Sequence, residues 1–278
     1  MDRLDAFKHI AAQASRGDIT FPANVNASLR LQQALNDPDC HVEEAARLIQ
    51  ADPLLAARSV AIANSVAYNR SRTEISSVRA AVQRLGVRTL QSLVAALIVR
   101  QIGSQVSEPS LAAKINQLWE HTAHVAALSQ VIARRVTHVD PDTALFAGIV
   151  HEVAGFYMLS QAGDYPQAME GEPEDWVEHG EIAIGRGVMA HLGVPESVVQ
   201  AIEAMWIGLR ALPPETMGDT LLLANDLSPV HSPLYQRPGA ATLQGARTID
   251  FVVGEGTLHA IMTESAQEVQ SLYAVLML

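Results

Sequence analysis

Apolar residues recur every three to four positions along most of this chain, the spacing that places them on one face of a helix. In one such segment, Val42, Ala45, Ala46 and Ile49 share a face. The pair Asp52-Pro53 is a capping residue followed by proline, which is typical of a helix start. The pattern favours helices over sheets throughout and predicts an all-α, multi-helical fold. The expected helices cover residues 27–35, 42–50, 53–63, 77–85, 87–102, 111–136, 143–159, 176–192, 195–207, 221–227 and 257–278.

Polar breaks divide these helices into groups. The break at residues 104–110 separates a five-helix N-terminal lobe, residues 19–107, from a second helical lobe, residues 108–227. Residues 1–18 are expected to form an N-terminal extension. Residues 228–278 are expected to form a C-terminal loop and a helix that packs on the core.

The C-terminal part combines an irregular stretch with an apolar end. Residues 228–245 contain Pro229, Pro233 and Pro238. A loop of this length is more often functional or mobile than a simple connection. Residues 272–278 carry no charge, so they should dock on the core or on another subunit. A homodimer through the C-terminal helix therefore stays open.

Composition limits the class of protein. With 278 residues, of which 49% are hydrophobic, the chain can bury a large core. It has no run of 18 apolar residues, its first residues lack the apolar stretch expected of a secretory signal, and the single Cys40 cannot form an internal disulfide. We therefore expect a soluble cytoplasmic protein with no membrane partner.

The charge of the chain is negative but unevenly distributed. A net charge of −11 argues against DNA binding, because that affinity depends on neutralising phosphates with Lys and Arg. Residues 58–100, however, contain seven arginines and one acid, Glu74, whereas residues 164–181 contain seven acids and no Lys or Arg. The basic segment could face an acidic partner or ligand, or it could simply be a set of solvated helix faces.

The chemistry of the chain concentrates at His151-Glu152 in an apolar helix, 30 residues after His121. Two helices that each present a histidine, one of them followed by a carboxylate, suggest a metal-dependent phosphohydrolase centre. His124 lies one turn beyond His121 and adds only a weak signal. Alternatively, both His121 and His151 are core histidines that bond to the backbone or to each other.

A set of short strings resembles a known family in the same order along the chain. The resemblance rests on Asp52-Pro53-Leu54-Leu55-Ala56-Ala57-Arg58, Ala63-Asn64-Ser65, Leu85-Gly86, Leu118-Trp119-Glu120-His121, Ala147-Gly148-Ile149-Val150-His151-Glu152, Val194-Pro195-Glu196 and Leu223-Ala224-Asn225. These strings are similar to the HDOD domain over residues 19–227. The resemblance implies a helical relative of the HD phosphohydrolases and a bacterial signalling or regulatory protein.

The resemblance also implies a degenerate metal site. An HD centre needs two histidines, an Asp beside the second and a later Asp, which together hold a divalent metal that activates water. Here Glu152 replaces the first Asp and Asn225 replaces the last one. Asp226 is displaced around its helix, and His179 is a substitute two residues out of phase. Glu181 and Met205-Trp206 stand where related hydrolases carry further histidines. We therefore expect no bound metal and no cofactor.

The remaining polar candidates have a structural and a functional interpretation. Glu152 is expected to be an acid inside a helix, satisfied by a neighbouring Arg or Trp, although it could act as a general base. Arg58, Arg84 and Arg88 are expected to tie helices together, although they could line a face that binds anions or a partner.

Three functions stay open. The first is a noncatalytic regulatory module that binds a protein of a signalling pathway. The second is a metal-dependent phosphohydrolase, or a nucleotide or cyclic-dinucleotide phosphodiesterase, with Glu152 and Asp226 as its catalytic residues. The third is a sensor that binds a nucleotide through residues 58–100 without catalysis.

Overall fold

The computed structural model describes residues 2–19, 21, 23–208, 211, 213–235 and 257–277. Within these ranges the secondary structure is helical and contains no strand, which confirms the predicted all-α class. Part of the predicted loop at residues 228–245 and the start of the segment after it, residues 236–256, lie outside the described ranges.

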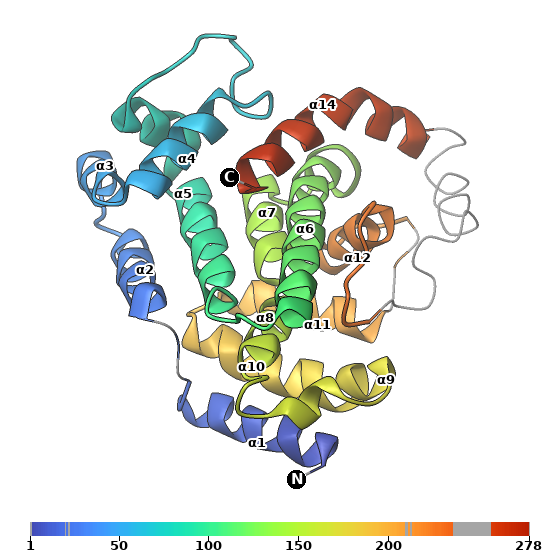
Figure 1. Cartoon of the computed structure of the whole chain (residues 1–278). Coiled ribbons are helices and arrows are strands. Elements are labelled where there is room, and N and C mark those ends of the chain that lie inside the picture. Colours follow the sequence, from blue (N-terminus) through green and yellow to red (C-terminus); the bar gives the residue numbers. More distant parts are fainter. Residues whose placement is uncertain are drawn as a thin grey trace.

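Helices α2 to α5 form one side of the molecule, and α1 lies apart from them (Figure 1). Asp52 caps α4 by accepting a hydrogen bond from the backbone N–H of Leu55, and Ser77 caps α5 in the same way. Gly86 interrupts α5 with a φ of 75°, a conformation that glycine adopts at little cost. Predicted helices 77–85 and 87–102 are therefore two parts of one kinked element. The helices are α1 Arg3–Arg16, α2 Ala23–Leu35, α3 Val42–Gln50, α4 Pro53–Asn64 and α5 Val78–Ile102.

The second half of the chain builds the centre of the molecule around α6 and α7. Two segments are π-helical turns where the sequence predicted uninterrupted α-helix. The turn η1 follows α6, and the turn η3 precedes α10. The elements are α6 Pro109–Ile132, η1 Ala133–Thr137, α7 Pro141–Val150, α8 Val153–Ser160, η2 Pro166–Met169, α9 Pro173–Asp175, η3 Trp176–Glu181, α10 Ile182–His191, α11 Glu196–Ile207, α12 Met217–Leu227 and α14 Thr257–Met277.

Helices α6 and α7 pack closely because Gly148 has no side chain. A Cβ atom on Gly148 would lie 2.6 Å from the Cα of Ala126, so only glycine allows the two backbones to approach this closely. Other apolar side chains of the two helices have almost no exposure, including Ala123, Val125 and Ile149. The close approach brings the histidines of the two helices together.

Helix α14 lies across α6 in Figure 1 and packs against it. Tyr273 of α14 stacks on His124 with ring centroids 3.9 Å apart, and its hydroxyl donates to Glu120 Oε1 at 3.2 Å. An ion pair joins Arg134 to Glu268. The apolar end of the chain thus covers α6 within the same molecule.

Two sequence expectations need correction. The predicted single helix over residues 143–159 is two helices, α7 and α8, which break at His151-Glu152. Residues 1–18, predicted as an N-terminal extension without an assigned helix, contain α1, which packs against α10 and η3. Phe7 meets Trp176 edge to face with ring centroids 5.8 Å apart, so this helix contributes to the core.

Two apolar helical stretches have the length and composition to cross a membrane, residues 78–102 and 141–160. In their most apolar windows, 67% and 89% of the residues are buried inside the protein. Burial of this extent is typical of the core helices of a soluble protein.

Candidate functional site

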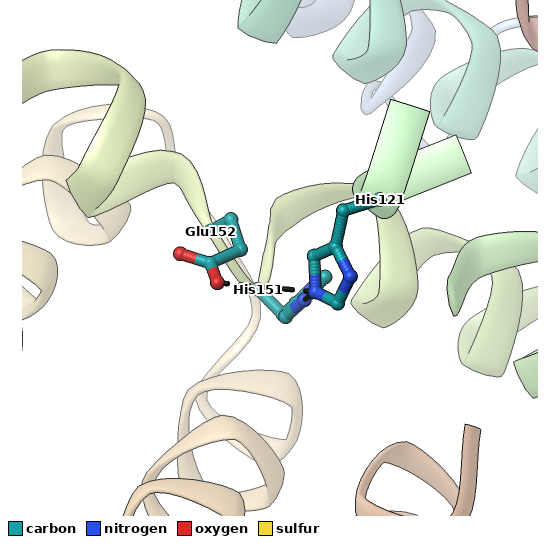
Figure 2. A group of neighbouring side chains, drawn as sticks. All are labelled: His121, His151 and Glu152. Atoms are coloured by element: carbon teal, nitrogen blue, oxygen red, sulfur yellow. Dashed lines mark hydrogen bonds and ion pairs between the residues drawn. The ribbon is translucent and has the colours of Figure 1, made fainter. Parts of the chain in front are cut away.

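Three side chains with metal-ligand chemistry meet where α6 faces the junction of α7 and α8 (Figure 2). His121 comes from α6, His151 is the residue that ends α7, and Glu152 follows it. One ligand atom from each residue lies within 4.8 Å of the other two, and all three residues are buried. In the described part of the chain, these residues form the one such group of His, Cys, Asp and Glu.

The break between α7 and α8 creates this arrangement. Glu152 has φ −103° and ψ 14°, outside the helical range, and it precedes the first residue of α8. The expectation that Glu152 lies inside a helix is therefore wrong. Because the helix stops here, Glu152 and His151 can both approach His121, whereas adjacent residues in a continuous helix point about 100 degrees apart.

Backbone carbonyls determine which nitrogen of each histidine carries its proton. His121 Nδ1 lies 2.7 Å from the carbonyl of Val230, and His151 Nδ1 lies 2.8 Å from the carbonyl of Gly148. A carbonyl can only accept, so both Nδ1 atoms must donate. In the neutral rings both Nε2 atoms then carry lone pairs, and these two atoms face each other at 3.3 Å. This tautomer is the one that binds a metal through Nε2, with the other nitrogen bonded to the surroundings.

Burial keeps the His121 ring neutral. Removal from water lowers the pKa of His121 to about 4, although the hydrogen bond to the Val230 carbonyl acts in the opposite direction. Glu152 Oε1 lies 3.9 Å from His121 Nε2. Because Nε2 of the neutral ring carries a lone pair, it cannot donate to the carboxylate, so this contact is neither an ion pair nor a hydrogen bond.

A short segment covers the histidines, and we call residues 228–235 the strap. Besides the bond from His121 to Val230, the side chain of Gln117 donates to the carbonyl of His231 at 3.0 Å. A Cβ on Gly155 would collide with Leu234 and would lie 3.3 Å from Glu152 Oε2. Glycine therefore leaves room for Leu234 beside the carboxylate. The sequence singled out this loop by its prolines but gave no sign that it binds His121.

Two other predicted histidines lie apart from this group. His124 is half-buried and stacks on Tyr273, and burial lowers its pKa. His179 is in η3, with its ring 46% exposed and 3.7 Å from Glu178. Neither supplies a ligand atom to the group formed by His121, His151 and Glu152.

The residues predicted to close the site from a later helix are both in α12. Asn225 is half-buried, and its backbone carbonyl accepts a hydrogen bond from the N–H of Ser228. Asp226 is not part of the described group of possible metal ligands. The described carboxylates thus contribute one residue, Glu152, to the group.

The three arginines singled out by the sequence occupy different environments. Arg84 donates to the carbonyls of Ala63 and Thr73, at 3.0 and 2.9 Å, and so ties α5 to the end of α4. Arg88 forms an exposed ion pair with Asp140 at 3.3 Å. Arg58 is 4% exposed, and its burial lowers its pKa. They do not form one anion-binding surface.

The donor set suits a divalent transition metal in part. Two neutral imidazoles and one carboxylate are ligand types that zinc, manganese and iron accept. His121 Nε2, His151 Nε2 and Glu152 would hold such an ion, and the ion would polarise a bound water or phosphate. Asn225, which the sequence resemblance places at the last Asp of an HD centre, carries no negative charge.

The helical fold and the paired histidines with an adjacent carboxylate agree with the family that the sequence resembles. The profile of the HDOD domain matches residues 21–206, more than half of the chain, so this chain belongs to the HDOD domain family. A search of the curated proteins found no match.

Solved structures share the fold. A protein of Shewanella amazonensis, provisionally named a metal-dependent phosphohydrolase, is 18% identical with a TM-score of 0.72, and the match covers 97% of each chain. An HDOD domain protein of unknown function from Geobacter sulfurreducens is 20% identical with a TM-score of 0.64, over 99% of this chain and 97% of that one. A protein of Marinobacter aquaeolei, provisionally named for signal transduction, is 16% identical with a TM-score of 0.61, over 100% and 67%.

Proposed function

We propose that this protein is a noncatalytic regulator of bacterial signalling that acts in the cytoplasm by binding a protein partner. The observation that carries the proposal is the state of the histidine centre. Glu152 is its one carboxylate among the described residues, and the strap covers it through Val230. A centre that hydrolyses phosphate esters needs an open coordination position for water or substrate.

The covered centre supports a structural role for the histidines. Each ring bonds a backbone carbonyl, His121 to the strap and His151 to the turn before it in α7. These bonds join α6, α7 and the strap in one buried polar group. Protein binding would then use surfaces elsewhere on the molecule and would not need the imidazoles as ligands.

Affinity capture tests the proposal. The full chain is immobilised and exposed to bacterial extract, and retained proteins are quantified by mass spectrometry against an empty support. We expect the same partner to be retained by the wild type and by a folded His151→Ala variant, because binding does not pass through the centre. Retention of no protein above the control would contradict the proposal.

The second candidate function is metal-dependent phosphohydrolysis, and the tautomers of the two histidines favour it. Two Nε2 lone pairs 3.3 Å apart, beside Glu152, form a set of donors that a divalent cation would stabilise. Elemental analysis of protein purified without chelator separates the two functions. The phosphohydrolase requires near-stoichiometric metal that His121→Asn loses, whereas the regulator requires none.

A further inference from the structure

A second site lies between the two lobes, apart from the histidine centre. A cavity of about 350 Å³ opens between α2, α5, α7 and the start of α11, and its lining does not include His121, His151 or Glu152. Its volume is within the usual range for small-molecule sites, roughly 300–1,000 Å³.

Two side-chain amides line the cavity. Gln32 of α2 is 5% exposed and can donate to or accept from a ligand there. The side chain amide of Gln91 donates to the carbonyl of Leu35 at 3.0 Å, which leaves its Oε1 atom to accept from a ligand.

A fixed carboxylate lies in the same cavity. Asp142 Oδ1 accepts hydrogen bonds from the hydroxyl of Tyr68 at 2.9 Å and from Gln130 Nε2 at 3.3 Å. Burial and the neighbouring Asp142 raise the pKa of Tyr68, so its hydroxyl stays a donor. The two donors hold Asp142 in place, and its second oxygen, Oδ2, is left to accept from N–H groups of a ligand.

The two ends of the cavity differ in polarity. Phe146, which is 8% exposed, and Val198 provide apolar walls near Asp142. Arg88 lines the cavity with a side chain that is 72% exposed, so its guanidinium lies towards solvent, paired with Asp140. A ligand that fits has a flat apolar face, an edge rich in N–H groups and an anionic end.

We propose that this cavity binds a purine nucleoside monophosphate, with guanine preferred over adenine. The base stacks against Phe146, Asp142 accepts from the ring N–H of the guanine edge through Oδ2, and the phosphate binds Arg88. Gln32 completes the edge through its amide, which can donate to the guanine carbonyl oxygen. Adenine presents a ring-nitrogen lone pair where guanine has its ring N–H, so the Asp142 carboxylate opposes it.

Isothermal titration calorimetry of the full chain with GMP, AMP and CMP tests this proposal. We expect GMP to bind and AMP to bind at least about tenfold more weakly, because a site built to pair with N–H groups rejects a base that lacks them. Gln32→Leu should weaken GMP binding by about tenfold or more, whereas Gln33→Leu on the exposed side of α2 should not change it.

Three further variants separate the cavity from effects on folding and from the histidine centre. Arg88→Gln changes an exposed side chain and should weaken GMP binding, with Arg47→Gln, in the exposed pair with Glu44, as its control. Asp142→Asn should abolish the preference for GMP over AMP, since an amide can donate to adenine. His121→Asn should leave GMP binding unchanged.

Some results would overturn the proposal. No heat with GMP at about 1 mM would exclude a site of useful affinity. Equal binding of GMP by Gln32→Leu and Gln33→Leu, or equal binding of GMP and CMP, would show that nucleotides bind elsewhere. Loss of GMP binding in His121→Asn would assign the nucleotide to the histidine centre.

Discussion

Replacing His121 by asparagine removes a buried ring whose protonation the folded chain opposes. The pKa of His121 is about 4 in the folded protein because the ring is buried, against an ordinary value of 6.5. The unfolded chain therefore takes up this proton at higher pH than the folded chain. The stability that the neutral ring contributes is complete above about pH 6.5 and is lost as the pH falls towards 4.

The magnitude follows from the two pKa values. The difference between 6.5 and about 4 corresponds to about 3 kcal/mol, because each pKa unit is worth about 1.36 kcal/mol. His121 is 1% exposed, so solvent screens this effect little. Asparagine keeps a side-chain N–H close to the position of Nδ1, which can still donate to Val230, and it does not titrate.

Urea unfolding of wild type and His121→Asn from pH 7 to pH 4, in chelator, measures the effect. The free energy of unfolding of the wild type, relative to the variant, should fall by about 3 kcal/mol over this range. His179→Asn, in an exposed part of η3, gives the baseline for replacing a surface histidine. A difference between wild type and His121→Asn that stays constant with pH would refute the reasoning.

Three further substitutions test close packing, a helix cap and the attachment of the strap. Gly148→Ala should lower the free energy of unfolding by about 1–3 kcal/mol, because its methyl would lie 2.6 Å from Ala126 Cα; an unchanged urea midpoint would contradict the close contact. Asp219→Ala removes the capping box of α12 and should cost about 2 kcal/mol, with a smaller loss in Asp219→Asn; equal losses would argue against the cap. Leu234→Ala should speed proteolysis within the strap, relative to the exposed Leu54→Ala; equal rates would show that Leu234 does not hold it.

The helical fold could be predicted because its signals are local. Apolar spacing in residues 42–50 and the caps Asp52 and Ser77 act within one helix, and the structure has these elements. Helix α1 was missed, although Phe7 and Ile10 are fully buried. Its apolar face is short, so its burial in the core can be recognised only from the packing of α10 and η3 against it.

The site could be predicted only in part. His121 and His151 were found because each lies in an apolar helix, and their separation in sequence matched the family pattern. The break at Glu152 could not be predicted, since the neighbouring Val150 and Val153 continue the apolar pattern of a helix. The bond from His121 to Val230 joins positions 109 residues apart, and no local pattern encodes such a contact.

Turnover in the presence of manganese tests the central claim most directly. The full chain, loaded with Mn²⁺, is assayed with bis(p-nitrophenyl) phosphate and with cyclic dinucleotides, beside a folded His151→Ala variant. We expect both proteins to give the same background rate, because the centre has one described carboxylate and lies under the strap. Hydrolysis by the wild type that disappears in His151→Ala would contradict a noncatalytic role.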